Sequence, residues 1–510
     1  MDAPNTLPFW LLIPLFSVIW YCIHFLLISN SNDEKSKKLP PGPYPLPVIG
    51  NLLQISGLLH RPLTKLSQTY GPLMSLKIGS RRAIVVSSPE IAKEVLHKHD
   101  LEFAGRRIVD AITAWDHHKV SIAWLPPQSQ WRNLRKICKE HIFSSERLNA
   151  SQGLRQQKVQ QLCNYVGQRC LNGQAIDIGE AAFSTTLDLM WNTFFSVDFA
   201  QSDSISSSFS SQGAKEMVGN AFKILSIPNL VDFFPILRAI DPQGIRRRAK
   251  VHFGKLLDIM DGIIRQRSQE RYTSNTYQRK NDFLETLLDL NQQNESVWSY
   301  KDMKHLILDL FLGGIDTSSV IVEWTMAELL RNPEKKSKAR DEIRKVIGQN
   351  ELVQESDISN LPYLQSVIKE TFRLWPVFPF LVHQAQSDTQ INGYVVPKNA
   401  DIYVNLWGMG RDPSLWSDPT SFVPERFMDG EIDMKGQHFQ LLPFGTGRRM
   451  CAGLPLADRM VHLMVASLLH KFEWKLEEGI KPEEIDMTEE FEGTMHKAVP
   501  LKAIALLKPL

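Results

Sequence analysis

Residues 443–453 read PFGTGRRMCAG, and helical periodicity begins directly after them. Three of these residues are glycines, which let a backbone approach a bulky planar group closely: Gly445, Gly447 and Gly453. Arg449 offers a fork of N–H donors that suits a carboxylate. Cys451 lies just before the expected helix N-terminus, where the helix dipole and the unpaired N–H groups favour a thiolate over a thiol. The loop therefore predicts a cysteine thiolate that binds iron.

This loop has two alternative interpretations. A glycine-rich phosphate-binding loop would end in lysine followed by serine or threonine, which is missing here, and it would leave Cys451 without a role. A buried structural cysteine is the second alternative. The convergence of glycines, arginine and cysteine favours the iron ligand over both.

The composition is that of an ordinary globular protein. Hydrophobic residues make up 43% and charged residues 22% of the 510 residues, which excludes a disordered chain. There are 58 basic and 56 acidic residues, so the formal net charge is +2, and nucleic acid is not expected as a partner. Five cysteines without a CxxC pair argue against a disulfide scaffold and a structural zinc module.

The N-terminus contains a candidate membrane anchor. Residues 7–28 carry no formal charge, and about 22 residues of helix are long enough to cross a bilayer core. A cleaved signal peptide is the alternative, but a basic start and a small-residue cleavage site are missing. Lysines follow the segment and only Asp2 precedes it, so the positive-inside rule places the N-terminus in the lumen and the remainder in the cytosol.

Three parts of the chain follow from this interpretation. Residues 1–30 form the anchor, and residues 31–50 form a basic, proline-rich hinge that proline makes stiff. Residues 51–510 form one catalytic body without an internal repeat or a break in composition. We expect this body to be mainly α with a minor β part.

The secondary structure of the body follows from its periodicity. Helices are expected at 91–98, 128–143, 154–170, 247–271, 301–330, 334–347, 361–374 and 454–470. Alternating apolar residues predict one hairpin from 73–78 and 82–87 around Gly79, and another within 391–405 that turns at 397–399.

The expected helix at 301–330 contains an unusual centre. Residues 313–319 read GGIDTSS, which are poor helix formers and predict a local opening of the helix. An acid beside a hydroxyl, Asp316 and Thr317, suits proton delivery. A helix–helix contact through small residues is the alternative, but it does not explain the acid.

The pattern Phe444-x-x-Gly447-x-Arg449-x-Cys451-x-Gly453 resembles that of the cytochrome P450 family of haem-thiolate enzymes. Other segments match the family in the expected order over essentially the whole chain: WRNLRK at 131–136, GGIDTS at 313–318, KETFR at 369–373 and PERF at 424–427. The anchor and the proline-rich hinge resemble those of members from the endoplasmic reticulum. Residues 404–419 and 451–476 are similar to plant microsomal geraniol and diterpene hydroxylases.

The resemblance implies a cytochrome P450 fold, preceded by one transmembrane helix, that binds haem b. Cys451 would be the axial iron ligand within the loop that contains Phe444, Gly447 and Gly453. The residues expected at the haem propionates are Trp131, Arg135, His383 and Arg449. The resemblance also implies a buried network of Glu370, Arg373 and Arg426 behind the cysteine loop.

The chain departs from the family between residues 378 and 386, which read FPFLVHQAQ. The family commonly has Pro-Arg or Pro-His there, and its basic residue pairs with a haem propionate. This segment is one residue short and lacks that proline, which places His383 at the position and leaves Gln384 as its alternative.

The resemblance implies a monooxygenase of the endoplasmic reticulum membrane. It would use O₂ and electrons from NADPH, delivered by NADPH–cytochrome P450 reductase, to hydroxylate a small apolar substrate, with a terpenoid expected from the subfamily. A haem-thiolate isomerase or dehydratase that needs no O₂ is the alternative enzyme, and a non-enzymatic haem-binding sensor is the third possibility. The Asp316–Thr317 pair favours the monooxygenase, because proton delivery is needed to split O₂.

Other conspicuous residues have simpler interpretations. His117 and His118 are expected to line a pocket mouth or to face solvent rather than to bind metal. Cys163 and Cys170 are expected to be core residues of one helix.

Overall fold

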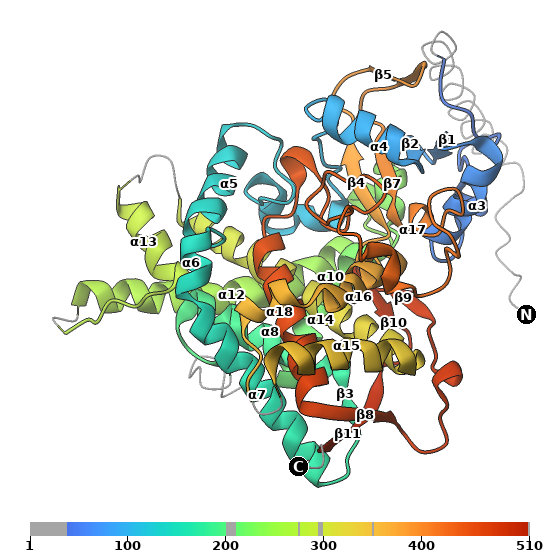
Figure 1. Cartoon of the computed structure of the whole chain (residues 1–510). Coiled ribbons are helices and arrows are strands. Elements are labelled where there is room, and N and C mark those ends of the chain that lie inside the picture. The colour runs from blue at the N-terminus through green and yellow to red at the C-terminus, as the bar shows by residue number, and fades with distance from the viewer. Residues whose placement is uncertain (1–37, 200–210, 274–275, 294–298, 349–350, 508–510) are drawn as a thin grey trace, which may run out of the picture.

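The computed structural model of the chain describes residues 38–199, 211–273, 276–293, 299–348 and 351–507 (Figure 1). The predicted anchor at 1–30 and the start of the hinge lie outside the described residues. The rest of the hinge is not a free spacer, because it lies along the first strand. The Ser75 N–H donates to the Pro41 carbonyl at 2.8 Å, and the Asn51 N–H donates to that of Lys77 at 2.6 Å.

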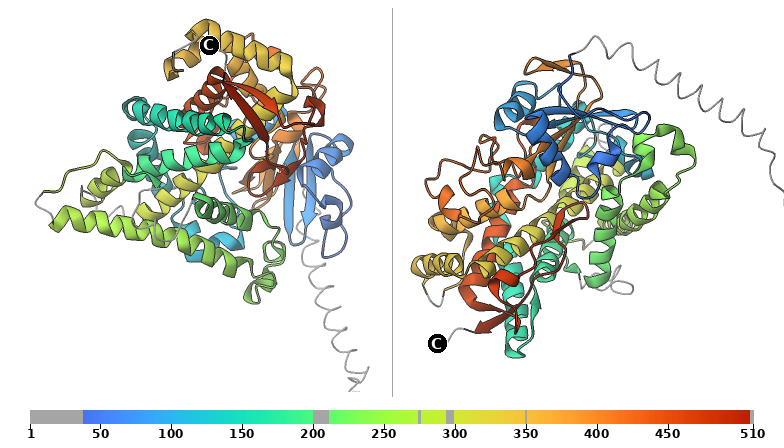
Figure 2. Two further views of the ribbon diagram at one scale, coloured as in Figure 1. Left: turned by 90° about the horizontal axis from the view of Figure 1, so that it is seen from below. Right: turned by 90° about the vertical axis from the view of Figure 1, so that its right-hand side faces the viewer.

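The main sheet has four strands in the order β1-β2-β7-β4. Strand β1 (Leu73–Ile78) and β2 (Arg81–Val86) form the hairpin predicted around Gly79. Strand β7 (Asp401–Asn405) pairs parallel to β2, and β4 (Phe380–Gln384) pairs antiparallel to β7. Figure 2 shows this sheet at one side of the molecule, away from most of the helices.

The predicted hairpin within 391–405 is wrong. Strand β6 (Tyr394–Val396) pairs with β5 (Thr389–Ile391), and the chain turns at Asn392 and Gly393, which both have positive φ. Asn-Gly is the preferred dipeptide of such two-residue turns, and this signal outweighs that of Pro397–Asn399. Strand β7 instead completes the main sheet. The remaining sheets join β3 (Ile176–Asp177), β11 (Lys502–Leu507) and β8 (Phe472–Leu476), and β9 (Glu489–Phe491) with β10 (Met495–Lys497).

All eight predicted helices are present, with ends within two residues of the predicted ones. They are α4 (Pro89–Lys93) with its π-helical extension (Glu94–Lys98), α5 (Ser129–His141), α7 (Gln152–Leu171), α12 (Ile245–Thr273), α14 (Tyr300–Arg331), α15 (Pro333–Ile347), α16 (Pro362–Leu374) and α18 (Leu454–Lys471).

Further helices were not predicted: α3 (His60–Tyr70), α6 (Ser145–Ala150), α8 (Ile178–Phe195), α10 (Ser211–Ser226), α11 (Leu230–Phe233), α13 (Phe283–Gln293) and α17 (Leu406–Met409). Helix α8 is buried on most of its faces. Its sequence therefore lacks the single apolar stripe by which an amphipathic helix is recognised.

Helix α14 runs through the middle of the molecule (Figure 1). The predicted opening at GGIDTSS is wrong, because α14 is continuous from end to end. Thr317 donates its hydroxyl to the Gly313 carbonyl at 2.7 Å, and Ser319 donates to that of Asp316 at 2.9 Å. Such bonds keep hydroxyl residues within a helix, and packing on both sides overrides their weak helix propensity.

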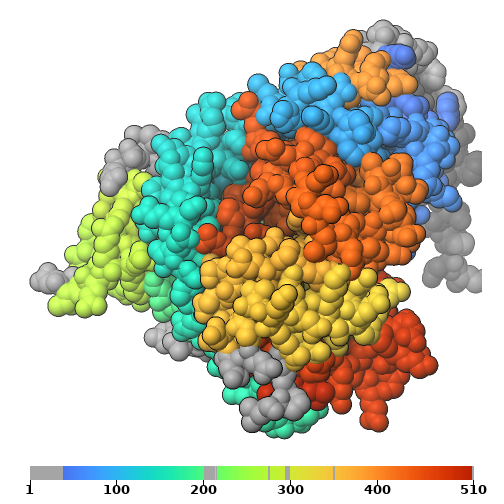
Figure 3. Space-filling model, viewed as in Figure 1, coloured from blue at the N-terminus to red at the C-terminus, as the bar shows by residue number. Residues whose placement is uncertain are grey.

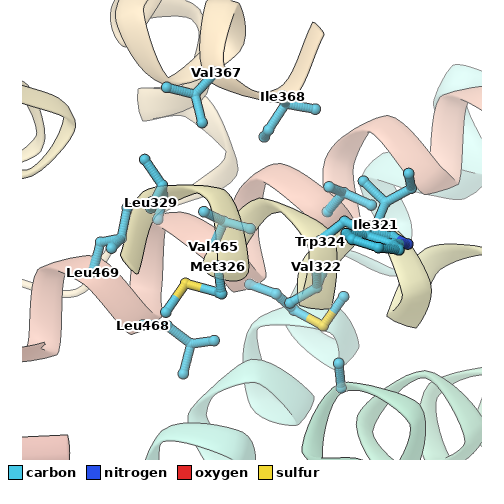
Figure 4. Close-up of a cluster of buried hydrophobic side chains, with 14 of the residues drawn as sticks. Ile321, Val322, Trp324, Met326, Leu329, Val367, Ile368, Val465, Leu468 and Leu469 are labelled. Atoms are coloured by element: carbon cyan, nitrogen blue, oxygen red, sulfur yellow. The ribbon is translucent and has the colours of Figure 1, made fainter. Parts of the chain in front are cut away.

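The largest hydrophobic cluster joins α14 to α16 and α18, with contributions from α7 and α15. Figure 4 shows its centre, where side chains of α14 such as Trp324 and Leu329 face Val367 and Ile368 of α16 and Leu468 of α18. Among the described residues, α14 is the one helix long and apolar enough to cross a membrane. Because 78% of that stretch is buried, α14 is a core helix.

Segments that are far apart in sequence therefore meet around α18. On the face shown in Figure 3, the part of the chain between about 130 and 170 (teal) borders residues beyond 400 (orange and red). Helix α18 begins directly after the cysteine loop and packs against α14, so the core fixes the position of that loop.

Candidate functional site

The cysteine loop turns back on itself before α18. Gly445 and Gly447 have φ values of 68° and 65°, in the left-handed region that favours glycine. The Cys451 N–H donates to the Phe444 carbonyl at 2.9 Å, which closes the loop. A Cβ atom added at Gly447 would lie 2.8 Å from the Leu96 carbonyl oxygen, so a close approach also requires glycine there.

The Cys451 sulfur lies among hydrogen-bond donors at the start of α18. The backbone N–H groups of Gly453 and Leu454 donate to it. Burial raises the pKa of the Cys451 thiol above its ordinary value, and the two N–H groups and nearby Arg135 act in the opposite direction. These donors stabilise negative charge on the sulfur, and the thiolate is the form that binds iron. Cys451 is nevertheless an exposed residue, so a ligand can reach its sulfur.

Arg449 is held by backbone oxygen atoms of the segment between residues 104 and 125. Its Nε donates to the Ala104 carbonyl at 2.9 Å, and its Nη1 donates to that of Ile122 at 3.4 Å. A third hydrogen bond joins Nη2 to the Leu125 carbonyl. The guanidinium also lies over the ring of Trp131, 4.8 Å from its centroid.

Three arginines gather at this point without an acidic partner. In the part of the chain that the structure describes, no carboxylate pairs with them: Arg106, Arg135 and Arg449. Burial lowers the pKa of Arg449 to about 9, and repulsion from Arg106 and Arg135 adds to this effect. Burial also lowers the pKa of Arg106 to about 10. A cluster of partly dehydrated cations next to the thiol fits a group that carries carboxylates.

His383 lies beside this cluster, but its hydrogen bond limits what it can bind. Its Nδ1 is 2.8 Å from the Phe103 carbonyl oxygen, which only accepts, so Nδ1 carries the proton. Burial lowers the pKa of His383 to about 3, and Arg106 adds to this effect. The neutral ring therefore offers only an acceptor at Nε2. The side chain of Gln384 is hydrogen-bonded to Asp401 instead.

Sequence reasoning missed Arg106, which has the donors that His383 lacks. Its Nη1 donates to the Val382 carbonyl, next to His383. Arg106 lies in a loop without periodicity, and its neighbour Arg107 pairs with Asp401 on the main sheet. The pair of adjacent arginines was the signal in the sequence. Only the fold shows that Arg106 binds the Val382 carbonyl whereas Arg107 binds Asp401.

The centre of α14 is exposed on one side. Gly313 is exposed although most of the helix is buried, and a Cβ atom added there would meet no atom within 4 Å. Thr317 follows one turn later and is partly exposed. Helix α14 is therefore open on this side to a bound molecule.

Asp316 does not point toward Thr317. Its carboxylate accepts a hydrogen bond from the Thr494 hydroxyl and lies 3.2 Å from His496 Nε2. Sequence reasoning missed both of these partners, which come from the C-terminal hairpin β9–β10. The acid and the hydroxyl are adjacent in sequence, but no hydrogen bond joins them among the described residues.

Glu370 binds two arginines in the interior behind the loop. Its carboxylate lies 2.6 Å from Arg373 Nε and 3.1 Å from Arg426 Nε, and it accepts a third hydrogen bond from the Val423 N–H at 2.8 Å. The side chains of Glu370 and Arg373 are completely buried. Phe372, between them in sequence, packs on Phe444, so the network adjoins the cysteine loop.

The expectation that His117 lines a pocket mouth or faces solvent is wrong. His117 is 2% exposed and stacks on His305 of α14, with ring centroids 4.9 Å apart. Its Nε2 lies 2.9 Å from Asp309 Oδ1, and Asp309 Oδ2 accepts from the Ile122 N–H at 2.8 Å. These contacts fasten the segment around Ile122 to α14. Packing against a distant helix has no signal in the local sequence.

Comparison with known proteins identifies the family. The model of the cytochrome P450 family matches residues 40–503. The chain belongs to the cytochrome P450 family. It is 51% identical to "Cytochrome P450 76T24" of Catharanthus roseus over 486 residues, which cover 95% of this chain and 96% of that protein. It is 46% identical to ferruginol synthase of Salvia miltiorrhiza over 496 residues (97% and 99%) and 45% identical to carnosic acid synthase of Rosmarinus officinalis over 480 residues (94% and 95%).

The chain is therefore a haem-dependent cytochrome P450 monooxygenase. It acts on a small organic substrate with O₂ and uses electrons that originate from NADPH and arrive through a redox partner. The observed residues fit haem b. Cys451, with N–H donors beside its sulfur, could supply a thiolate to the iron, and the arginines beside it could pair with the two propionates.

The buried Glu370 network generates a prediction about this cytochrome P450. Glu370→Ala leaves the buried Arg373 without its carboxylate, and Arg373→Ala removes one of the two guanidinium groups that compensate the buried Glu370. Breaking such a buried pair costs roughly 3–5 kcal/mol. We expect a lower unfolding temperature and loss of haem, measured by circular dichroism and by haem content per chain. Arg265→Ala is the control, because it removes an exposed ion pair with Asp261 and should leave both quantities unchanged. Normal haem content in both network variants would contradict the prediction.

Proposed function

We propose that this cytochrome P450 hydroxylates a terpenoid at the membrane of the endoplasmic reticulum, with Cys451 as the axial ligand of its haem iron. The position of the Cys451 sulfur carries the proposal, because it combines accessibility with N–H donors from Gly453 and Leu454. Haem b, when bound, supplies the iron that activates O₂ for insertion into a C–H bond. The other roles follow from the residues around that position.

The substrate class rests on the relatives. Those at 45–47% identity include proteins named for ferruginol, carnosic acid and sugiol, which are terpenoids. They match this chain over more than nine-tenths of its length. The electrons would come from NADPH–cytochrome P450 reductase.

Replacing Cys451 tests the iron ligand. With Cys451→Ala, the reduced protein with CO should lose the red-shifted Soret band that thiolate ligation gives. Cys163→Ala and Cys170→Ala should keep it, because these cysteines belong to α7 and its hydrophobic core. The absorption spectrum of the reduced protein with CO is recorded for all three variants. A band like that of the wild type in Cys451→Ala would mean that another residue binds the iron.

Arg106, Arg449 and Arg135 would hold the haem propionates, with Trp131 beside them. Arg106→Gln should lower haem affinity by about tenfold or more, because a charge-assisted hydrogen bond contributes roughly 1.5–3 kcal/mol. His383→Gln should have a smaller effect, since the neutral imidazole has no proton to donate at Nε2. Haem transfer to apomyoglobin gives the relative affinities. A larger loss of haem affinity in His383→Gln than in Arg106→Gln would assign propionate binding to His383 instead of Arg106.

Thr317 would hold water on the exposed side of α14 and help to supply the protons that the reduction of O₂ consumes. Thr317→Ala should keep haem and substrate binding, whereas product formed per NADPH falls and hydrogen peroxide is released. Thr317→Ser should restore most of the coupling, because it keeps the hydroxyl. Ser318→Ala is the control, since Ser318 is buried and only donates to the Gly314 carbonyl. Unchanged coupling in Thr317→Ala would assign proton delivery to another group.

Membrane attachment has support outside the proposed anchor. Ile236 and Ile240 are 88% and 69% exposed, and Leu53 is 70% exposed. Ile236 and Ile240 follow Phe233 in the chain, and Leu53 follows Leu52. Phe233 and Leu52 pack in the same hydrophobic cluster beside β1 and β2. Exposed apolar groups gathered near the start of the body suit contact with a lipid surface.

Loss of this apolar surface should weaken membrane binding. In a chain without its first 30 residues, Ile236→Glu combined with Ile240→Glu should reduce co-sedimentation with liposomes. Leu171→Glu is the matched control, because Leu171 is 74% exposed at the end of α7. Equal sedimentation of both variants would exclude this surface as the contact. Digestion of the body in sealed microsomes would support its cytosolic position.

A further inference from the structure

A cavity reaches α14 from the side of the C-terminal hairpin. Its volume is about 430 Å³, and it lies among α8, α10, α14 and the β9–β10 hairpin. Asp316, Ser319 and Glu323 of α14 line its floor. Exposed residues such as Glu216 and Glu490 line its mouth, so the cavity is continuous with solvent. Thr317 is not among its lining residues.

His496 and Thr494 determine where the Asp316 carboxylate points. Thr494 is completely buried, and its hydroxyl contacts both Asp316 and His496 Nε2, the latter at 2.7 Å. His496 Nε2 lies 3.2 Å from Asp316 Oδ2, and its side chain is 31% exposed. The imidazole therefore connects a buried carboxylate with the water of the cavity.

The charge around His496 is mainly negative. The acidic groups are Asp316 and Glu323 of α14, Glu490 and Glu492 of the hairpin, Asp177 and Glu180 at the start of α8, and Glu216 of α10. The basic groups are Lys215 and Lys223 of α10 and Lys497 of the hairpin. Burial lowers the pKa of His496, but the hydrogen bond and the charge of Asp316 outweigh burial, so the pKa is raised overall.

We propose that His496 and Thr494 are positioning residues that hold the Asp316 carboxylate toward this cavity, so that the cavity supplies the protons that α14 delivers. The proposal rests on the proposed role of Thr317 in proton supply. A carboxylate buried in α14 without these partners would have to leave water at a large energetic cost. With them, the carboxylate has hydrogen-bond partners at the end of a cavity that is open to solvent.

The His496–Asp316 pair has a defined dependence on pH. A histidine whose pKa is raised by folding stabilises the protein below its unfolded pKa of about 6.5, and this contribution is lost as the pH rises through the folded pKa. Above that pH, His496 would no longer offer a positive charge to the carboxylate. Coupling of NADPH consumption to product should therefore fall as His496 loses its proton.

The first test measures the pairing without turnover. Hydrogen–deuterium exchange at the imidazole C2 position, followed by mass spectrometry, gives the titration midpoint of each histidine in the holoenzyme. The midpoint of His496 should lie above about 6.5 in the wild type and should fall in Asp316→Asn. His462, which faces Asp458 at 3.4 Å on α18, is the control and should not change between the two proteins. An Asp316→Asn midpoint equal to that of the wild type would overturn the proposal.

The second test follows product per NADPH between about pH 6 and pH 9. In the wild type, the ratio should fall near the His496 midpoint. His496→Gln keeps a hydrogen-bond donor but does not titrate, so its ratio should be lower at acidic pH and should not change near that midpoint. A pH profile like that of the wild type in His496→Gln would refute a positioning role.

The two tests separate this proposal from the proposed function. Normal coupling in Thr317→Ala would show that the hydroxyl does not deliver protons, whereas the His496 midpoint would still depend on Asp316. If His496→Gln does not fold, the exchange experiment still decides, because it requires only the wild type and Asp316→Asn.

Discussion

The structure depends on one buried carboxylate. Glu370 binds two guanidinium groups and a backbone N–H in the interior, and among the described residues no other carboxylate pairs with these guanidinium groups. Arg373 then donates to the carbonyls of Pro419 and Ser421 at 2.7 and 3.0 Å, so a segment without regular structure becomes attached to α16. Because buried charges are costly when unpaired, loss of one of these contacts weakens the whole set. The cysteine loop follows that segment in the chain, and its Phe444 packs on Phe372 of α16.

Charge is distributed unevenly around the candidate site. Among the described residues, Arg106, Arg135 and Arg449 have no carboxylate partner, whereas the cavity beside α14 carries an excess of carboxylates around His496. The cationic cluster suits the carboxylates of an anionic cofactor, and the acidic cavity attracts protons and excludes anions. Asp316 of α14 lines the acidic cavity, which is the position that the proposed supply of protons requires.

Much of the fold and of the cysteine loop could be predicted from the sequence, because their signals are local. The loop contains its glycines, arginine and cysteine within 11 residues, and each long amphipathic helix has its own periodicity. The hairpin within 391–405 was wrong because two turn signals competed, and the opening in α14 was wrong because packing overrides propensity. Arg106 and His496 could not be found, since their partners lie 276 and 180 residues away. Only the packed chain brings them to the site.

The way in which Arg449 is held has a consequence for how such enzymes diversify. Its three acceptors are main-chain carbonyls of Ala104, Ile122 and Leu125, and every type of amino acid supplies a carbonyl. Side chains in this segment can therefore be exchanged without removing an acceptor from the arginine. Since the same segment packs against α14 through His117, such exchanges would reshape the surface beside that helix while the three hydrogen bonds of Arg449 are retained. The position of this arginine is therefore insulated from changes in the side chains that surround it.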